Sequence, residues 1–225
     1  MAVWYNILMS KRIIAPSILS ANFADMGSDV KSLSAIGADW VHIDVMDGVF
    51  VPNLTFGFKM IKDIRPLSDL FFDAHLMITN PKRYVKRFVE SGAELVSFHY
   101  EAEEEIDETL DIILGAGAKC GLAINPDTDV DVIIPYLPKL DLILIMSVFP
   151  GFGGQKFIEG SLERISRARE LRDKYAPQAV VEVDGGVTVD NAKSIFAAGA
   201  DVLVAGNAVF GAADRRAAVK LIRGE

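Results

Sequence analysis

The feature that most constrains this chain is a repeated alternation of short apolar runs with longer amphipathic segments. Such a pattern indicates βα units whose parallel strands are buried on both faces. Eight runs are predicted strands, and they are Ile13–Ile18, Trp40–Val45, Leu70–Leu76, Leu95–His99, Cys120–Ile124, Leu142–Met146, Val180–Val183 and Val202–Ala205. The predicted helices are Asp25–Ile36, Phe58–Arg65, Pro81–Ser91, Glu104–Gly115, Val130–Ile134, Ser161–Lys174, Val189–Ala198 and Asp214–Arg223.

The length of these units predicts a closed barrel. The chain has 225 residues, so each unit has about 28, near the minimum for a strand, a helix and two turns. We therefore expect residues 1–225 to form a single-domain (β/α)₈ TIM barrel, with residues 1–10 as a short N-terminal extension. Periodicity alone leaves an open doubly wound sheet as the alternative, but no Gly-x-Gly-x-x-Gly follows the first strand.

Glycines at four helix ends support the same organisation. Gly37, Gly92, Gly117 and Gly199 each follow a predicted helix and precede a predicted strand. Glycine commonly adopts the left-handed conformation that ends a helix. We expect these four residues to be structural.

Composition narrows the possible partners. The 23 basic and 31 acidic residues give a net charge of −8, and no basic stripe is available to bind nucleic acid.

The one cysteine, Cys120, cannot form an internal disulfide, and its strand-like setting predicts a packed thiol in a reducing compartment. The opening segment is too short for a signal peptide, and no apolar stretch has membrane-spanning length. We expect a cytoplasmic protein, although a plastid form without its transit peptide would look the same.

Polar residues concentrate where the predicted second strand ends. Barrels of this type build their sites at the C-terminal ends of the strands. The two-residue period of a strand places His42, Asp44 and Met46 on one side and Asp47 on the other. One histidine and one aspartate are therefore predicted to point together.

Two other strand ends supply similar groups. The third strand ends with His75 and the seventh with Asp184, which completes a His, Asp, His, Asp set. Nitrogen and carboxylate ligands of this kind suit Zn²⁺, Fe²⁺, Mn²⁺ or Co²⁺. Each histidine alone is an ordinary hydrogen-bonded barrel residue, but the conjunction favours a metal site. His99 is not followed in its strand by a methionine, as His42 is by Met46 and His75 is by Met77, and we expect it to be structural or to lie behind the ligands.

Glycines after the last three strands suggest a phosphate site. They lie in Gly151–Gly154, Gly185-Gly186 and Gly206-Asn207. Tight turns need glycine whatever the function, but the loops after strands seven and eight are the usual phosphate site of such barrels. A phosphorylated substrate is therefore expected.

Two further features have ordinary interpretations. Met46, Met77 and Met146 are typical core residues, yet their shared place beside the predicted ligands favours a lining that excludes water. The acidic stretch Glu101–Glu108 is expected to be a solvated helix start without function.

Taken in order, these motifs resemble those of the ribulose-phosphate 3-epimerase family, from the first strand to the last helix. The motifs are Ser17, His42-Ile43-Asp44-Val45-Met46-Asp47-Gly48, Val51-Pro52-Asn53, His75-Leu76-Met77, Pro150-Gly151-Phe152-Gly153-Gly154-Gln155 and Val183-Asp184-Gly185-Gly186. The resemblance implies epimerisation of D-ribulose 5-phosphate to D-xylulose 5-phosphate at C3, a reaction of the pentose phosphate pathway and the Calvin cycle. Inverting a carbon beside a ketone also requires two separated acid/base groups on chemical grounds.

The resemblance also implies the roles of individual residues. It implies one divalent metal ion per chain, held by His42, Asp44, His75 and Asp184. Zn²⁺ is expected in preference to Fe²⁺, Mn²⁺ or Co²⁺, and no organic cofactor is expected. Asp44 and Asp184 are the catalytic pair. The residues expected to contact substrate are Ser17, His75, Met46, Met77, Met146, Gly151, Phe152, Gly153, Gly154, Gly185, Gly186, Gly206 and Asn207. A homo-oligomer is expected, with Val3, Trp4 and Tyr5 as candidate interface residues.

Two departures and three rivals qualify the resemblance. Asn207 replaces a common Ser or Thr, and Phe149 replaces a common polar residue at the edge of the sugar pocket. The closest rival is an epimerase for a six-carbon phosphoketose such as allulose 6-phosphate. A related decarboxylase would carry Asp-x-Lys-x-x-Asp on the third strand, but Asp73-Ala74-His75 lacks that lysine. A non-catalytic sugar-phosphate-binding barrel would not need two aspartates beside two histidines.

Overall fold

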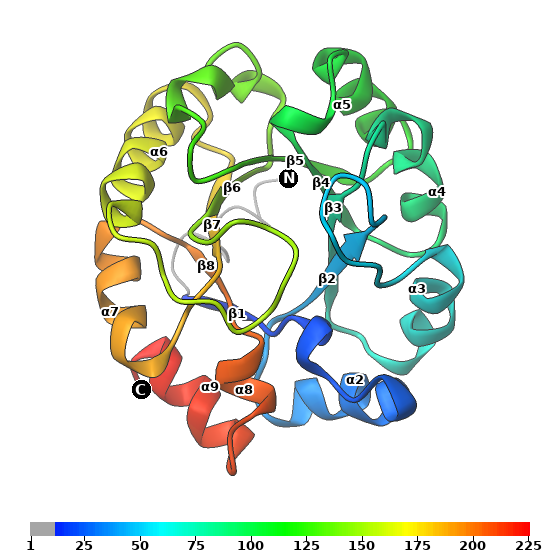
Figure 1. The fold of residues 1–225 in the computed structure, drawn as a ribbon, viewed down its shortest axis with the longest axis vertical. Coiled ribbons are helices and arrows are strands. Elements are labelled where there is room, and N and C mark those ends of the chain that lie inside the picture. Colours follow the sequence, from blue (N-terminus) through cyan, green and yellow to red (C-terminus); the bar gives the residue numbers. More distant parts are fainter. Residues whose placement is uncertain (1–11) are drawn as a thin grey trace.

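The computed structural model describes residues 12–225, in which eight parallel strands form a barrel surrounded by helices (Figure 1). The predicted extension 1–10 and its Val3, Trp4 and Tyr5 lie outside the described residues. The strands are β1 (Ile13–Ala15), β2 (Trp40–Met46), β3 (Phe71–Met77), β4 (Leu95–His99), β5 (Lys119–Ile124), β6 (Leu142–Met146), β7 (Val180–Asp184) and β8 (Val202–Val204). All eight predicted strands are present, with small shifts at their ends.

The strand order confirms the barrel over the doubly wound sheet. Neighbouring strands follow the order β1-β8-β7-β6-β5-β4-β3-β2, and all pairs are parallel. The seam between β1 and β2 is closed by backbone hydrogen bonds from Asp39 to Ile14 (3.0 Å) and from His42 to Pro16 (3.2 Å). A single parallel bridge between Ser17 and His42 completes that seam.

Helices surround the strands (Figure 1). They are α2 (Met26–Ala35), α3 (Phe58–Ile64), α4 (Val85–Glu90), α5 (Ile106–Gly115), α6 (Ser161–Tyr175), α7 (Val189–Ala198), α8 (Asn207–Phe210) and α9 (Arg215–Arg223). The predicted helix Val130–Ile134 is present as the short 3₁₀ helix η6 (Val130–Ile133) and not as an α-helix. Pro135 lies two residues beyond its end and has no backbone N–H with which to continue the helix. The short helix α8 was not predicted.

The predicted helix-ending glycines have the expected backbone conformation. Gly37, Gly92, Gly117 and Gly199 have φ values of +88°, +109°, +90° and +120°. The chain therefore leaves each of these helices through a left-handed residue and turns into the next strand.

Apolar side chains pack on both faces of the sheet. Along β6, Leu142, Leu144 and Met146 belong to the interior cluster, whereas Ile143 and Ile145 belong to the cluster shared with the helices. Each fully buried aliphatic side chain of this kind contributes roughly 1.5–3 kcal/mol. This alternation fixes which side chains enter the barrel, so it also determines which polar groups meet at the strand ends.

Cys120 is the packed thiol that its sequence setting predicted. Its side chain is fully buried, and Sγ donates to the carbonyl oxygen of Lys139 at 3.1 Å. Burial, together with the negative charge of Asp141, raises the pKa of this thiol to about 12.

Across residues 12–225, none of the helices combines the length and apolar character required to cross a bilayer.

Candidate active site

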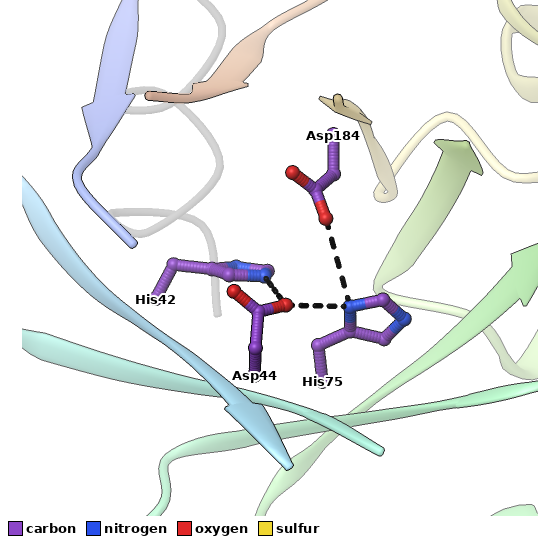
Figure 2. A group of neighbouring side chains, drawn as sticks. All are labelled: His42, Asp44, His75 and Asp184. Atoms are coloured by element: carbon purple, nitrogen blue, oxygen red, sulfur yellow. Dashed lines mark hydrogen bonds and ion pairs between the residues drawn. The ribbon is translucent and has the colours of Figure 1, made fainter. Parts of the chain in front are cut away.

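Four side chains from three strands meet inside the carboxyl end of the barrel (Figure 2). His42 and Asp44 come from β2, His75 from β3 and Asp184 from β7. Asp44 and His75 are direct partners in the β2–β3 register. His75 Nδ1 lies 3.2 Å from Asp44 Oδ1 and 3.8 Å from Asp184 Oδ2, and His42 Nε2 lies 3.3 Å from Asp44 Oδ1.

This group fits a divalent metal ion. One donor atom from each of the four residues lies within 4.8 Å of the others. His42 Nε2 is buried and has no hydrogen-bond partner among residues 12–225, which is costly for a polar atom that water cannot reach. Two imidazoles and two carboxylates are ligands that several divalent transition metals accept. The four predicted ligands are therefore brought together in an arrangement able to hold a metal.

A second pair of buried carboxyl groups lies behind His42. Asp73 Oδ2 is 2.6 Å from His42 Nδ1, and Glu182 Oε1 is 3.6 Å from the same nitrogen. His42, Asp73 and Glu182 also form a cluster within 4.8 Å. The 2.6 Å separation is that of a hydrogen bond, so a proton and not a metal ion joins His42 to Asp73. With Nδ1–H donated to Asp73, the lone pair of Nε2 faces the metal-site group.

The two site aspartates have opposite electrostatic environments. Burial, reinforced by the negative charge of Asp44, raises the pKa of Asp184 to about 7. Burial opposes ionisation of Asp44 as well, but the adjacent His42 and His75 side chains hold its pKa below its ordinary value. Burial lowers the pKa of His75 to about 4. Two carboxyl groups whose pKa values are pushed apart in this way suit an acid/base pair.

A cavity of about 290 Å³ opens above the two aspartates. Both carboxyl groups line it, whereas the His42 and His75 side chains lie behind them and do not. Of the residues predicted to contact substrate, all except His75 line this cavity, namely Ser17, Met46, Met77, Met146, Gly151, Phe152, Gly153, Gly154, Gly185, Gly186, Gly206 and Asn207. The structure therefore gathers residues that lie up to 190 positions apart in the sequence around one space.

Ser17 connects the barrel seam to the site. Its hydroxyl group donates a hydrogen bond to Asp44 Oδ2. Ser17 Oγ also accepts a hydrogen bond from the backbone N–H of Leu19 at 3.2 Å and thereby caps the 3₁₀ helix η1 (Ile18–Ser20). Ser17 is thus held in place by its own loop while it orients one carboxylate.

Two of the glycines on the cavity wall pack too closely against their neighbours to carry a side chain without movement. A Cβ atom at Gly186 would lie 2.3 Å from the backbone nitrogen of Phe157, and Gly186 has a φ of +64°. A Cβ atom at Gly154 would lie 2.4 Å from Asn207 Nδ2. Glycine at these positions leaves main chain on this wall of the cavity, as a phosphate cradle requires.

Glu101, the first residue of the acidic stretch 101–108, is exposed as expected, but its carboxylate also has partners within the protein. Glu101 is not simply solvated, because its carboxylate accepts a hydrogen bond from the backbone of Asn125 (2.8 Å) and another from the Thr128 hydroxyl. Its second oxygen lies 3.3 Å from Nδ1 of His99. His99 is fully buried and lies directly behind His75.

Sequence reasoning missed Asp73, Glu182 and Glu101. Asp73 and Glu182 each precede a predicted ligand by two residues, so the period of a strand places them on the same inner side of the barrel. That spacing was the available signal. Asp47, by contrast, lies where it was expected, away from the cluster, and accepts hydrogen bonds from Thr79, Val49 and Phe50.

Comparison with solved structures supports the fold. A 3-hexulose-6-phosphate synthase from Salmonella typhimurium superposes with a TM-score of 0.70 at 17% sequence identity, covering 94% of this chain and 96% of that protein. An identity this low shows a shared barrel fold alone.

Sequence comparison identifies the family. Residues 13–210 match the model of the ribulose-phosphate 3 epimerase family. The ribulose-phosphate 3-epimerase of Bacillus subtilis is 47% identical over 212 residues, which cover 94% of this chain and 98% of that protein. The chloroplastic ribulose-5-phosphate-3-epimerase of Arabidopsis thaliana is 48% identical over 213 residues, covering 94% of this chain and 76% of that protein. The chain therefore belongs to the ribulose-phosphate 3-epimerase family.

Proposed function

We propose that this protein interconverts D-ribulose 5-phosphate and D-xylulose 5-phosphate by proton transfer at C3. The observation that carries this proposal is the placement of Asp44 and Asp184. They come from the non-adjacent strands β2 and β7 and line one cavity. Membership of the epimerase family and the activity named for the Bacillus and Arabidopsis relatives support the same reaction.

The two aspartates supply the acid and the base. The C3 proton of the substrate is acidic because the neighbouring carbonyl group accepts the negative charge left behind. One carboxylate removes this proton from one face of the carbon, and the other carboxyl group delivers a proton to the opposite face. The reverse reaction exchanges their roles. The hydrogen bond from Ser17 to Asp44 Oδ2 keeps that carboxylate directed into the cavity.

The proposed metal site combines the two carboxyl groups that line the cavity with the two histidines behind them. We propose that His42, Asp44, His75 and Asp184 hold one divalent ion per chain, with Zn²⁺ favoured by the nitrogen and carboxylate donors and Fe²⁺, Mn²⁺ and Co²⁺ as alternatives. When bound there, the ion would supply Lewis-acid stabilisation of the oxygen charge that develops as the proton leaves C3.

The remaining cavity wall binds and shields the substrate. Three buried methionines, Met46, Met77 and Met146, belong to its apolar part and exclude water from the reactive enediolate. The proposed phosphate contacts are Gly151–Gly154, Gly185, Gly186, Gly206 and Asn207. They lie in the loops after β6, β7 and β8, where barrels of this type commonly bind phosphate.

Three further statements belong to the proposal. The chain is one domain, forms a homo-oligomer and acts in the cytoplasm or, in a plastid-bearing source, in the plastid. The statement on location is supported by bacterial and chloroplastic relatives, whose matched segments each cover 94% of this chain.

Proton NMR of ribulose 5-phosphate in D₂O with the metal-loaded enzyme tests the function. We expect exchange of the C3 hydrogen together with the appearance of xylulose 5-phosphate. Allulose 6-phosphate serves as the comparison substrate and should react more slowly. Absence of both exchange and epimerisation with ribulose 5-phosphate would refute the five-carbon assignment, and rapid turnover of allulose 6-phosphate would then support the six-carbon alternative.

A further inference from the structure

The main-chain carbonyl groups of both site aspartates accept hydrogen bonds from hydroxyl groups that the proposed mechanism does not use. Thr55 Oγ1 donates to the main-chain oxygen of Asp44 at 2.6 Å. Ser147 Oγ donates to the main-chain oxygens of Asp184 at 2.9 Å and of Gly185 at 2.7 Å. A carbonyl oxygen only accepts hydrogen bonds, so the hydroxyl group is the donor in each case. Two segments far apart in the sequence therefore hold the same main-chain atom of the two aspartates.

Thr55 acts where β2 has no strand beside it. The pairing of β1 with β2 ends at the bridge between Ser17 and His42, and the chain then enters η1. Alternate residues of a strand direct their main-chain polar groups to the same side, so those of Asp44 and Met46 face the side of β1, as those of His42 do. Thr55 Oγ1 donates to the first and accepts from the N–H of the second at 3.0 Å. This hydroxyl group thus replaces a strand neighbour.

Ser147 acts at the end of β7. It follows β6 directly and is fully buried. Its N–H donates to the main-chain oxygen of Asp184 at 2.8 Å, and its hydroxyl proton is shared between that oxygen and the oxygen of Gly185. Gly185 has a φ of +117°, so the extended strand ends there. Ser147 therefore holds the main chain on both sides of the point at which β7 ends.

The main chain determines where each carboxyl group can reach, because the side chain of aspartate is short. A misplacement of about 1 Å at a reacting group can lower a reaction rate about 100-fold. A proton-transfer scheme with two carboxyl groups is exposed to this loss at both of them. Support for the main chain of Asp44 and Asp184 is therefore support for their chemistry.

We propose that Thr55 and Ser147 are positioning residues that hold the main chain of Asp44 and Asp184 in the geometry required for proton transfer. Neither residue belongs to the described residues that line the cavity, so both act through the aspartates and not on the substrate. The inference rests on the proposed function and adds to it two residues outside the set that the sequence predicted.

Removal of each hydroxyl group tests the proposal. We expect Thr55→Val and Ser147→Ala each to lower kcat about 10- to 100-fold, with a smaller change in KM. Thr55→Ser keeps a hydroxyl group and should recover most of the lost kcat. Unchanged kcat in Thr55→Val and Ser147→Ala, or equal losses in Thr55→Val and Thr55→Ser, would overturn the proposal.

Two control variants remove buried hydroxyl groups elsewhere in the barrel. Thr109 Oγ1 donates to the main-chain oxygen of Glu105 at 3.0 Å, and Ser91 Oγ donates to that of Arg87 at 2.7 Å. Thr109→Val and Ser91→Ala should lower the melting temperature as the site variants do, but their kcat should be unchanged. Equal losses of kcat in the control and site variants would reduce Thr55 and Ser147 to a structural role. If Ser147→Ala did not fold, the two Thr55 variants would decide.

Amide hydrogen exchange, followed by NMR on the full chain, gives a readout that does not depend on turnover. Thr55→Val should accelerate exchange of the Met46 N–H, which has lost its acceptor, but not that of the His42 N–H, which donates to the chain of β1. Equal acceleration at both amides would indicate general destabilisation and would count against the proposal.

This measurement also separates the inference from the proposed function. If the wild-type chain did not exchange the C3 hydrogen of ribulose 5-phosphate, the proposed function would fail, while amide exchange would still decide whether Thr55 holds this main chain. If the wild-type chain turned over and Thr55→Val kept both its kcat and the protection of Met46, only the present inference would fail.

Discussion

Asp44 and Asp184 both approach one atom, Nδ1 of His75, at 3.2 Å and 3.8 Å, although they belong to strands β2 and β7. The structure thus brings the two proposed proton-transfer groups to a shared centre while leaving both on the wall of the cavity. Their removal is the most direct test of the two-base scheme.

We expect Asp44→Asn and Asp184→Asn each to lower kcat by about 10²- to 10⁴-fold, because an amide can neither take nor deliver the C3 proton. Binding of a phosphorylated competitive inhibitor should persist, because the glycine loops are unchanged. Asp47→Asn is the control, since Asp47 bonds to Thr79 and to its own loop, and its loss of kcat should be much smaller. Full activity in either of the first two variants would refute the scheme.

Metal content and activity should change together. We expect elemental analysis to find close to one divalent ion per chain, and verified removal of that ion should abolish turnover. Restoring Zn²⁺, Fe²⁺, Mn²⁺ or Co²⁺ separately would show which ions support activity. Undiminished turnover by protein shown to be metal-free would exclude a catalytic metal.

The role of Gly186 in the wall of the cavity can be tested with a matched pair of substitutions. Gly186 and Gly117 both have positive φ, but an added Cβ meets the Phe157 backbone only at Gly186 and nothing within 4 Å at Gly117. Gly117→Ala should cost about 1–2 kcal/mol of stability through backbone strain, with KM unchanged. Gly186→Ala should cost more and raise KM, because the loop must move. Calorimetry and steady-state kinetics measure both effects, and equal KM values would remove Gly186 from the substrate site.

The buried thiol predicts a pH dependence of stability. The pKa of Cys120 is about 12 in the folded protein, whereas an unfolded thiol titrates near ~8.5. The unfolded chain therefore releases this proton first, so the stabilising contribution is complete below pH ~8.5 and is lost as the pH rises toward the folded value. Cys120→Ala should flatten the fall in unfolding free energy between pH ~8.5 and ~10. A thiol reagent should label Cys120 only after the protein has unfolded. Rapid labelling of the folded protein would contradict the burial of this thiol.

The sequence predicted the strands and the site residues through the same signal, the two-residue period at strand ends. It predicted that His42 and Asp44 share a face because side chains two positions apart in a strand do, and the structure places both in one cluster with His75. It did not find the role of Asp73, because that carboxylate becomes a partner of His42 only through the β2–β3 register, in which the two residues are opposite. Pairing between strands is a property of the folded barrel.

Two departures from the sequence predictions have physical causes. The helix predicted over Val130–Ile134 is only the short 3₁₀ helix η6, because Pro135 has no backbone N–H to continue the helical hydrogen bonds. Glu101 lies in an acidic run that would normally be solvated, but the loop after β5 folds back and supplies donors from Asn125 and Thr128. A hydrogen bond between segments about 25 residues apart is invisible to a reading of local pattern.

The bridge between Ser17 and His42 closes the barrel at the residue that also donates to Asp44. The proposed site then continues as far as Asn207, so its members span nearly the whole chain. A half-barrel ending between β4 and β5 would contain Asp44 without Asp184, and its complement the reverse. Turnover can therefore arise only after the last strands have joined the first, which makes enzymatic activity a direct reporter of completed folding during synthesis or refolding.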